Sequence, residues 1–270
     1  GQPGRALGLG ITASFVGGLI SWGFLVALSY PMASISTKLG PFDLFALVLV
    51  ALVLIAAVSE GSLTRGILSG LLGILAAMPG TSPATGELRW TLGLPELSDG
   101  LKLLPVLIGL FAVSQVIHEL INLDQKTERV EVRRRGIFMS LADWRAQAVN
   151  LIRSSLIGTW IGILPGIGAN IGSVMAYSAA KSMSKTPKQF GHGSEEGIVA
   201  SEAANNATVG GALIPLIALG IPGSVIDAIL LGGLVIHGLT PGALLFTQNP
   251  EVVYTMMAAV LLANVFMYVF

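Results

Sequence analysis

The sequence predicts an all-α polytopic membrane protein, and three observations support this fold class. Of the 270 residues, 53% are hydrophobic and 11% are charged, whereas about 25% of residues are charged in ordinary soluble domains. The mean hydropathy is +0.79. The apolar residues also gather in runs of roughly 20, the length at which a helix crosses a bilayer core of about 30 Å.

Five apolar runs are candidate transmembrane helices: 6–31, 42–58, 63–79, 103–121 and 251–270. Pro and Gly repeatedly interrupt the apolar stretches between the last two runs, which favours discontinuous helices there. We therefore divide the chain into scaffold-like transmembrane helices (1–123), a basic cytoplasmic connection (124–153), a substrate- and ion-binding region with two helix breaks (154–245) and a shortened last transmembrane helix (246–270).

Composition also excludes several classes of protein. The 15 basic and 15 acidic residues give zero net charge, which gives no sign of a nucleic-acid partner. The absence of cysteine excludes disulfides, thiolate metal sites and cysteine catalysis. The chain opens at Gly1 without an initiator Met or a signal segment, so we expect it to be part of a longer protein.

The basic residues predict the orientation in the membrane, because cytoplasmic loops carry an excess of Lys and Arg. The loop 80–102 carries acidic residues and is expected to face outward. The connection 124–153 is expected to face the cytoplasm because it holds Lys126, Arg129, Arg133, Arg134, Arg135, Arg145 and Arg153.

The stretch 158–181 reads as a membrane helix that is broken in its middle. A single crossing would carry the basic loop with Lys181, Lys185 and Lys188 to the outside, against the charge rule. A re-entrant hairpin that turns at 164–168 keeps both basic flanks in the cytoplasm. Each arm of about a dozen residues also suits a re-entrant segment better than a full span.

The break itself has a chemical consequence. Pro165 removes a backbone donor, and Gly166 and Gly168 accept backbone angles that other residues resist. Irregular backbone at membrane depth survives only inside protein or beside a polar cavity. Free amides at 168–172, helped by the side chains of Asn170 and Ser173, could then bind an anion. The alternative is a Pro/Gly kink that only shapes helix packing.

A second break, Gly220-Ile-Pro222-Gly223-Ser224, interrupts the apolar run 209–236. Paired discontinuous helices indicate a transporter binding site. Ser224 could cap the following helix or present its hydroxyl to substrate. Asp227, three residues on, is a candidate coupling group or a residue at a cavity mouth.

Between the breaks, the segment 201–208 carries polar residues at helical spacing. Glu202, Asn205 and Asn206 share one face and supply oxygen ligands for Na⁺, with Asn205 and Asn206 as the favoured pair. Interhelical hydrogen bonding is their alternative role. Our candidates for ion coupling, by Na⁺ or H⁺, are Glu202, Asn205, Thr208 and Asp227. Enzyme motifs are absent from the sequence: the glycine run 166–172 misses the dinucleotide spacing by one residue, and no cofactor is expected.

Three segments at these separations, PGIGA, SEAANNA and GIPGS, resemble the large membrane subunit of tripartite tricarboxylate transporters, the TctA family. The segments FGHGS and IHGLTPG are similar to other parts of the same family. The resemblance implies half of an inverted-repeat transporter, since the family carries one pair of breaks in each half. It also implies substrate-site roles for Pro165, Gly166, Gly168, Asn205, Asn206, Pro222, Gly223 and Ser224.

The resemblance further implies ion-driven uptake of tricarboxylates or related dicarboxylates across the bacterial inner membrane, with a small four-helix membrane subunit and a periplasmic solute-binding protein. Two other classes remain open at this point. A channel or pore-forming subunit would use the breaks as a selectivity filter. A structural membrane scaffold would use them only for packing.

Overall fold

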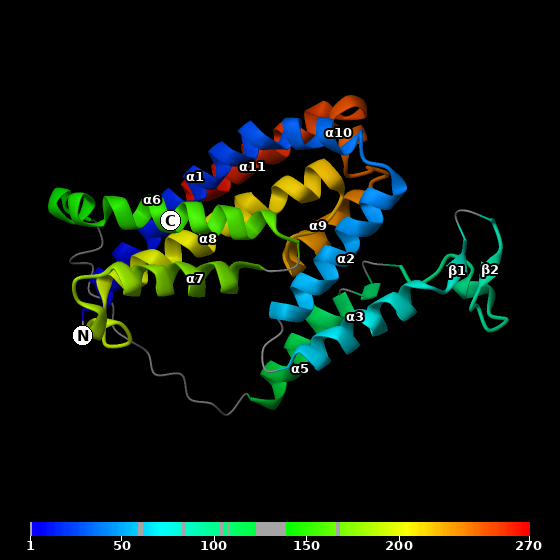
Figure 1. The fold of residues 1–270 in the computed structure, drawn as a ribbon, viewed down its shortest axis with the longest axis horizontal. Helices are drawn as coiled ribbons and strands as arrows, with labels where there is room; N and C mark the ends of the chain where they lie inside the picture. Colours follow the sequence, from blue (N-terminus) through cyan, green and yellow to red (C-terminus); the bar gives the residue numbers. More distant parts are fainter. Residues whose placement is uncertain are drawn as a thin grey trace.

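The computed structural model describes residues 2–58, 62–82, 85–102, 105–106, 108–122, 139–165 and 168–270. The prediction of an all-α chain is confirmed within these residues (Figure 1). The helices are α1 (Pro3–Ser36), α2 (Pro41–Val58), α3 (Leu63–Ala77), the π-helix η2 (Ile108–Val113), α5 (Ser114–Ile121), α6 (Leu141–Ile163), α7 (Gly168–Met183), α8 (Glu195–Leu219), α9 (Val225–Ile236), α10 (Ala243–Gln248) and α11 (Pro250–Val269).

Short elements complete the chain. In the loop 80–102, β1 (Gly80–Thr81) pairs antiparallel with β2 (Leu88–Arg89), a small hairpin that the sequence did not predict. Two single 3₁₀ turns, η1 (Pro95–Leu97) and η3 (Pro187–Gln189), lie in loops.

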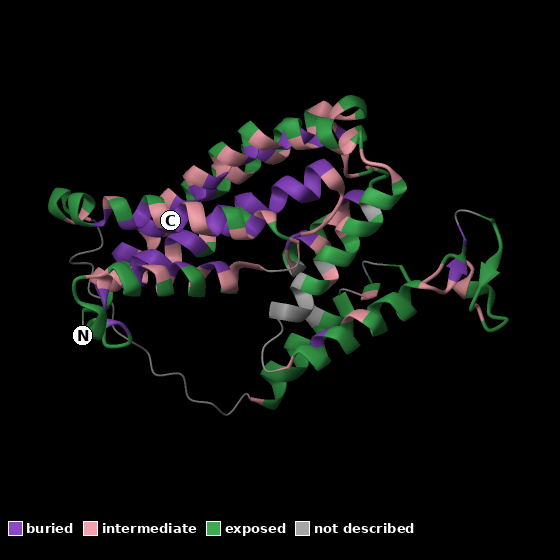
Figure 2. Cartoon of the chain, in the orientation of Figure 1, coloured by how far each residue is buried: buried purple, intermediate pink, exposed green. Residues whose placement is uncertain are grey.

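Helix α8 is the centre of a bundle in which α1, α6 and α7 pack against it. Figure 2 shows that α8 is buried along most of its length. Helix α11 packs antiparallel to α1. The Nε1 of Trp22 donates to the carbonyl of Met257 at 2.9 Å, and the earlier residue Phe15 stacks on the later residue Tyr268. This bundle carries both predicted helix breaks.

Three helices of the bundle begin at the same end. The guanidinium of Arg5, in the first turn of α1, bonds to Asp143 of α6 at 2.8 Å and to Glu195 of α8 at 2.9 Å. The three helices therefore run parallel. Since α7 returns the chain from α6 to the start of α8, α6 and α7 form a helical hairpin whose two flanks lie at one end of the bundle. That this hairpin is re-entrant in a membrane stays a prediction.

The ion pairs of Arg5 give a pH prediction. Hydrogen bonding to Arg5, and then to Ser140, lowers the pKa of Asp143 well below its usual range. A carboxylate whose pKa is lower in the folded state than in the unfolded state stabilises the fold when the pH is above the unfolded pKa, about 3.9 for Asp. This stabilisation is lost as the pH falls toward the folded pKa. We expect Asp143→Asn to lower the thermal unfolding midpoint by a few degrees at pH 7, and by less as the pH drops below about 4. An equal difference in unfolding midpoint between wild type and variant at pH 7 and below about pH 4 would contradict this.

Helix α1 belongs to the α8 bundle. From the sequence alone it is grouped instead with the scaffold-like helices of 1–123. The reason that α1 joins α8 is backbone contact through glycine. A Cβ atom added at Gly17 would lie 2.1 Å from the carbonyl oxygen of Ala203 on α8. Small residues of this kind let membrane helices approach closely, whereas α2 and α3 pack against each other.

Helix α6 has a polar inside and an apolar outside. Its buried face includes Gln147, Asn150 and Ser154, while Val149 and Trp160 are 72% and 58% exposed. A soluble protein shows the reverse arrangement. The exposed apolar face of α6 therefore suits contact with lipid.

Two described helices, Pro3–Ser36 and Pro250–Val269, are long and apolar enough to cross a membrane. They correspond to the predicted runs 6–31 and 251–270. The predicted runs 42–58 and 63–79 form α2 and α3, and the described part of 103–121 is helical from Ile108. How many of these helices cross the bilayer stays a prediction.

Helix α6 begins inside the segment 124–153 that we predicted as a connection. Ser140 caps it: its hydroxyl accepts from the amide of Asp143 at 3.2 Å, and its own amide donates to the Asp143 carboxylate at 2.9 Å. This reciprocal capping box stabilises a helix start. Its signal in the sequence is Ser140 followed three residues later by Asp143. Lys126, Arg129, Arg133, Arg134 and Arg135 lie outside the described residues.

Candidate functional site

The first helix break lies where the sequence placed it. Helix α6 ends at Ile163, and Leu164 adopts an extended conformation with φ −78° and ψ 121°, as expected of a residue that precedes proline. Helix α7 restarts at Gly168, whose φ of +74° is left-handed and favours glycine. Pro165 is described and half-buried, whereas Gly166 lies outside the described residues.

The second break follows the same local chemistry. Helix α8 ends in a left-handed cap at Gly220, with φ 72°, a common way for helices to terminate. Ile221, Pro222 and Gly223 then connect to α9 without helical structure. Both interruptions are thus produced by Pro and Gly at the positions that the sequence marked.

The two breaks are neighbours in space. A Cβ atom added at Gly223 would lie 2.9 Å from the carbonyl oxygen of Gly162, in the last turn of α6, and 2.8 Å from the Cβ of Ala212. The backbone of the second break therefore touches the helix end that leads into the first. We call this region, residues 162–165, 168–172 and 220–227 with Thr208 and Ala212 of α8, the break cluster.

Thr208 belongs to the break cluster through packing. Its hydroxyl donates to the carbonyl of Ala204 at 2.8 Å. A Cβ atom added at Gly172 of α7 would lie 2.6 Å from that hydroxyl oxygen, and one added at Gly162 would lie 2.4 Å from the Thr208 carbonyl. Both arms of the α6–α7 hairpin therefore pack against Thr208 of α8.

Ser224 caps α9, the first of the two roles that its sequence position allowed. Its hydroxyl accepts from the amide of Asp227 at 3.3 Å and lies 2.6 Å from the Oδ2 of Asp227, to which it donates. Asp227 is 4% exposed. The carboxylate of Asp227 therefore stands at the amino end of α9, where an anionic substrate would otherwise be attracted.

The remaining polar candidates of α8 face a different neighbour. The Nδ2 of Asn206 donates to the carbonyl of Ser14 at 2.6 Å and to the Oδ1 of Asn264 at 3.0 Å. The hydroxyl of Ser14 donates to Glu202 at 3.3 Å. We call Ser14, Glu202, Asn206 and Asn264 the amide cluster; a hollow of about 220 Å³ borders its two asparagines.

The helix geometry explains this separation. Residues 206 and 208 are about 200° apart around an α-helix, so Asn206 faces α1 and α11 while Thr208 faces α6 and α7. Asn205 and Asn170 are exposed and join neither group through a described side-chain contact. The structure therefore divides the predicted site residues between two places.

Asn264 is one of two polar residues of the amide cluster, with Ser14, that sequence reasoning missed. It is buried, and its Nδ2 donates to the carbonyl of Phe15 at 3.0 Å. A single amide inside the apolar run 251–270 was the available signal, because polar residues within membrane helices usually find polar partners.

Comparison with known proteins gives a family match over the whole chain. A family model described as the tripartite tricarboxylate transporter TctA family matches residues 1–270. The chain is 32% identical over 265 residues to an uncharacterized 52.8 kDa protein in the TAR-I ttuC' 3'region of Agrobacterium vitis, covering 98% of this chain and 52% of that protein.

A second relative, an uncharacterized protein in the TAR-II ttuC' 3'region of Agrobacterium vitis, is 38% identical over 107 residues, which cover 40% of this chain and 44% of the relative. The chain thus spans about half the length of the first curated relative. No solved structure matches it.

Proposed function

This chain belongs to the tripartite tricarboxylate transporter TctA family, and from that premise we propose that it forms the ion-coupled path for carboxylate uptake. The substrate is a tricarboxylate or a related dicarboxylate. The transporter lies as a multi-pass subunit in the bacterial inner membrane, with a small four-helix membrane subunit and a periplasmic solute-binding protein as partners. The observation that supports this most is the contact between the two helix breaks at Gly162 and Gly223.

In this proposal the break cluster binds the substrate. The amides that open α7, beginning at Gly168, attract a carboxylate because a helix amino terminus carries unpaired donors. Pro165, Gly166, Pro222 and Gly223 shape the backbone around it. The hydroxyl of Ser224 binds the substrate once its hydrogen bond to Asp227 breaks, and protonation of Asp227 would favour breaking that bond.

The amide cluster is the proposed place for Na⁺. A half-turn of the Asn206 side chain would exchange its Nδ2 for Oδ1 and bring three oxygens together: its own, the Ser14 carbonyl and the Asn264 Oδ1. Hard cations prefer such oxygen ligands. Glu202 lies beside Ser14 and supplies negative charge. If H⁺ is the coupling ion instead, Glu202 and Asp227 are its carriers.

Alternating access would follow from movement of the α8 bundle, which includes α1, against α2, α3 and α5. This differs from a division in which all of 6–121 stays fixed, because the glycine contacts of α1 tie it to α8. Rocking of one bundle around a central site is the usual motion of transporters with broken helices.

The two clusters can be tested separately by uptake of labelled carboxylate into cells that express the full-length protein. Asn206→Ala is expected to raise the Na⁺ concentration needed for half-maximal uptake by about tenfold, the factor that about 1.4 kcal/mol gives. Ser224→Ala is expected to lower uptake at every Na⁺ concentration. Ser182→Ala, which removes an exposed hydroxyl from α7, is the control. If both variants kept normal uptake and Na⁺ dependence, the site assignment would fail.

A further inference from the structure

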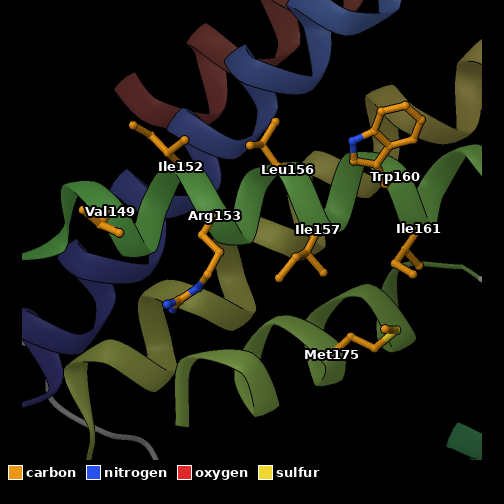
Figure 3. A pocket seen from close by; sticks show the side chains of 8 residues that line it. All are labelled: Val149, Ile152, Arg153, Leu156, Ile157, Trp160, Ile161 and Met175. Carbon is orange, nitrogen blue, oxygen red and sulfur yellow. The ribbon is translucent and has the colours of Figure 1, made fainter. Parts of the chain in front are cut away.

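An apolar groove of about 640 Å³ follows the outer face of α6. Figure 3 shows its lining side chains along α6 from Val149 to Ile161, with Met175 of α7 across from Ile157 and Ile161. The residues from Val149 to Ile161 extend over about 18 Å of helix. That length is close to one leaflet of the bilayer, which is about 15 Å deep.

One cation interrupts the apolar lining. The Nη2 of Arg153 donates to the Oδ1 of Asn150 at 2.6 Å, and among the described residues its Nη1 donates only to the sulfur of Met183, at 3.2 Å. Its Nε is buried and has no hydrogen-bond partner among the residues that the structure describes. Within the described part of the chain, ion pairs join Arg5 to Asp143 and Glu195 and Lys102 to Asp99, so Arg153 has no carboxylate partner there.

Leaving a guanidinium in this state is unfavourable. A thioether is a weak acceptor, and a partly buried cation without an anion loses hydration that no partner replaces. Met183 is 66% exposed, so its side chain can move aside at little cost. The Nη1 of Arg153 would then be free for a stronger, charged acceptor.

Lysine residues lie near one end of the groove. Met183, which touches Arg153, ends α7, and the residues around that end include Lys181, Lys185 and Lys188. The other end of the groove, at Ile161 and Met175, is apolar. The surface therefore presents a long apolar channel with a basic end, which is complementary to a molecule with one apolar chain and one anionic head.

We propose that this groove binds an anionic phospholipid, with an acyl chain along Val149, Ile152, Leu156 and Trp160 and the headgroup phosphate on Arg153. The phosphate accepts from Nη1 in place of the Met183 sulfur and supplies the missing negative charge. A transmembrane helix from another protein would cover the apolar lining equally well but would bring no phosphate to the arginine. The site is separate from the break cluster and the amide cluster.

Native mass spectrometry of the full chain, released from detergent with a mixture of phosphatidylglycerol and phosphatidylcholine, tests the proposal. Wild-type protein should retain phosphatidylglycerol preferentially. Arg153→Gln should reduce the ratio of retained phosphatidylglycerol to phosphatidylcholine by about fivefold, the effect of one basic residue at an anionic lipid surface. Arg145→Gln, which removes an exposed arginine of the same helix outside the groove, is the matched control and should leave the ratio unchanged.

Two further measurements separate the lipid from other occupants. Leu156→Trp, which fills the groove, should reduce retention of both lipids, while glycerol phosphate without acyl chains should not displace phosphatidylglycerol. Equal ratios for wild type and Arg153→Gln would overturn the proposal. Full displacement of phosphatidylglycerol by glycerol phosphate would also overturn it, because that result would indicate a simple anion site. A loss of dimers in Leu156→Trp with lipid retention intact would overturn it too, because that result would indicate a second copy of the chain in the groove.

Discussion

Gly223→Ala is expected to abolish carboxylate uptake while the protein still reaches the membrane. The added methyl carbon would lie 2.8 Å from the Cβ of Ala212 and 2.9 Å from the carbonyl oxygen of Gly162. Non-bonded carbon atoms prefer about 3.5–4.0 Å, and neither neighbour is the end of a flexible side chain. The second break must therefore move away from the first, which separates the groups that we propose surround the substrate.

The control for this prediction lies on the next helix. Gly233 is in α9, and a Cβ atom added there would meet no atom of the described residues within 4 Å. Gly233→Ala should retain uptake and gain a little helix stability, by about 1 kcal/mol or less. Membrane amounts of both variants are measured alongside uptake. Normal uptake by Gly223→Ala would show that the contact between the breaks has no part in transport.

The largest effect on stability is expected from Gly17→Ala. Its methyl carbon would lie 2.1 Å from the carbonyl oxygen of Ala203, 2.9 Å from the carbonyl carbon and 3.0 Å from the Cα. These are all backbone atoms of a buried helix, so α1 has to separate from α8. Overpacking of a core commonly costs about 1–3 kcal/mol and occasionally more, and we expect the upper part of this range or beyond.

The same helix offers a matched control, since a Cβ atom added at Gly23 would lie more than 4 Å from every neighbouring atom in the described part of the chain. Thermal unfolding in detergent, followed by size-exclusion chromatography, compares the two variants. Gly23→Ala should unfold at or slightly above the wild-type temperature, and Gly17→Ala well below it. Identical unfolding temperatures would mean that α1 does not pack against α8 in this way.

Local backbone chemistry was predictable from the sequence. Proline at 165 places Leu164 in an extended conformation, and glycines at 168 and 220 take left-handed angles. These outcomes depend on one or two neighbouring residues, so they do not need knowledge of the fold. The order of the apolar runs was predictable for the same reason, because each run is a property of a short segment.

The tertiary arrangement was not predictable in the same way. Nothing local places Gly223 against Gly162, because 61 positions separate them and α7 and α8 intervene. The pairing of Asn206 with Asn264 likewise depends on α11 returning along α1. Helical periodicity separates Asn206 and Thr208 by about 200° around α8, but only the structure shows which neighbour each face meets.

The contact between the breaks also brings backbone ends of both polarities to one location. Helices α6 and α8 terminate near it with their carbonyl ends, while α7 and α9 start near it with their amide ends. Each helix macrodipole is equivalent to roughly half an elementary charge, negative at the carbonyl end and positive at the amide end. A carboxylate held by the amides that start α7 would therefore lie beside the carbonyl ends of α6 and α8, and the repulsion between them would favour a conformation in which those ends are farther apart.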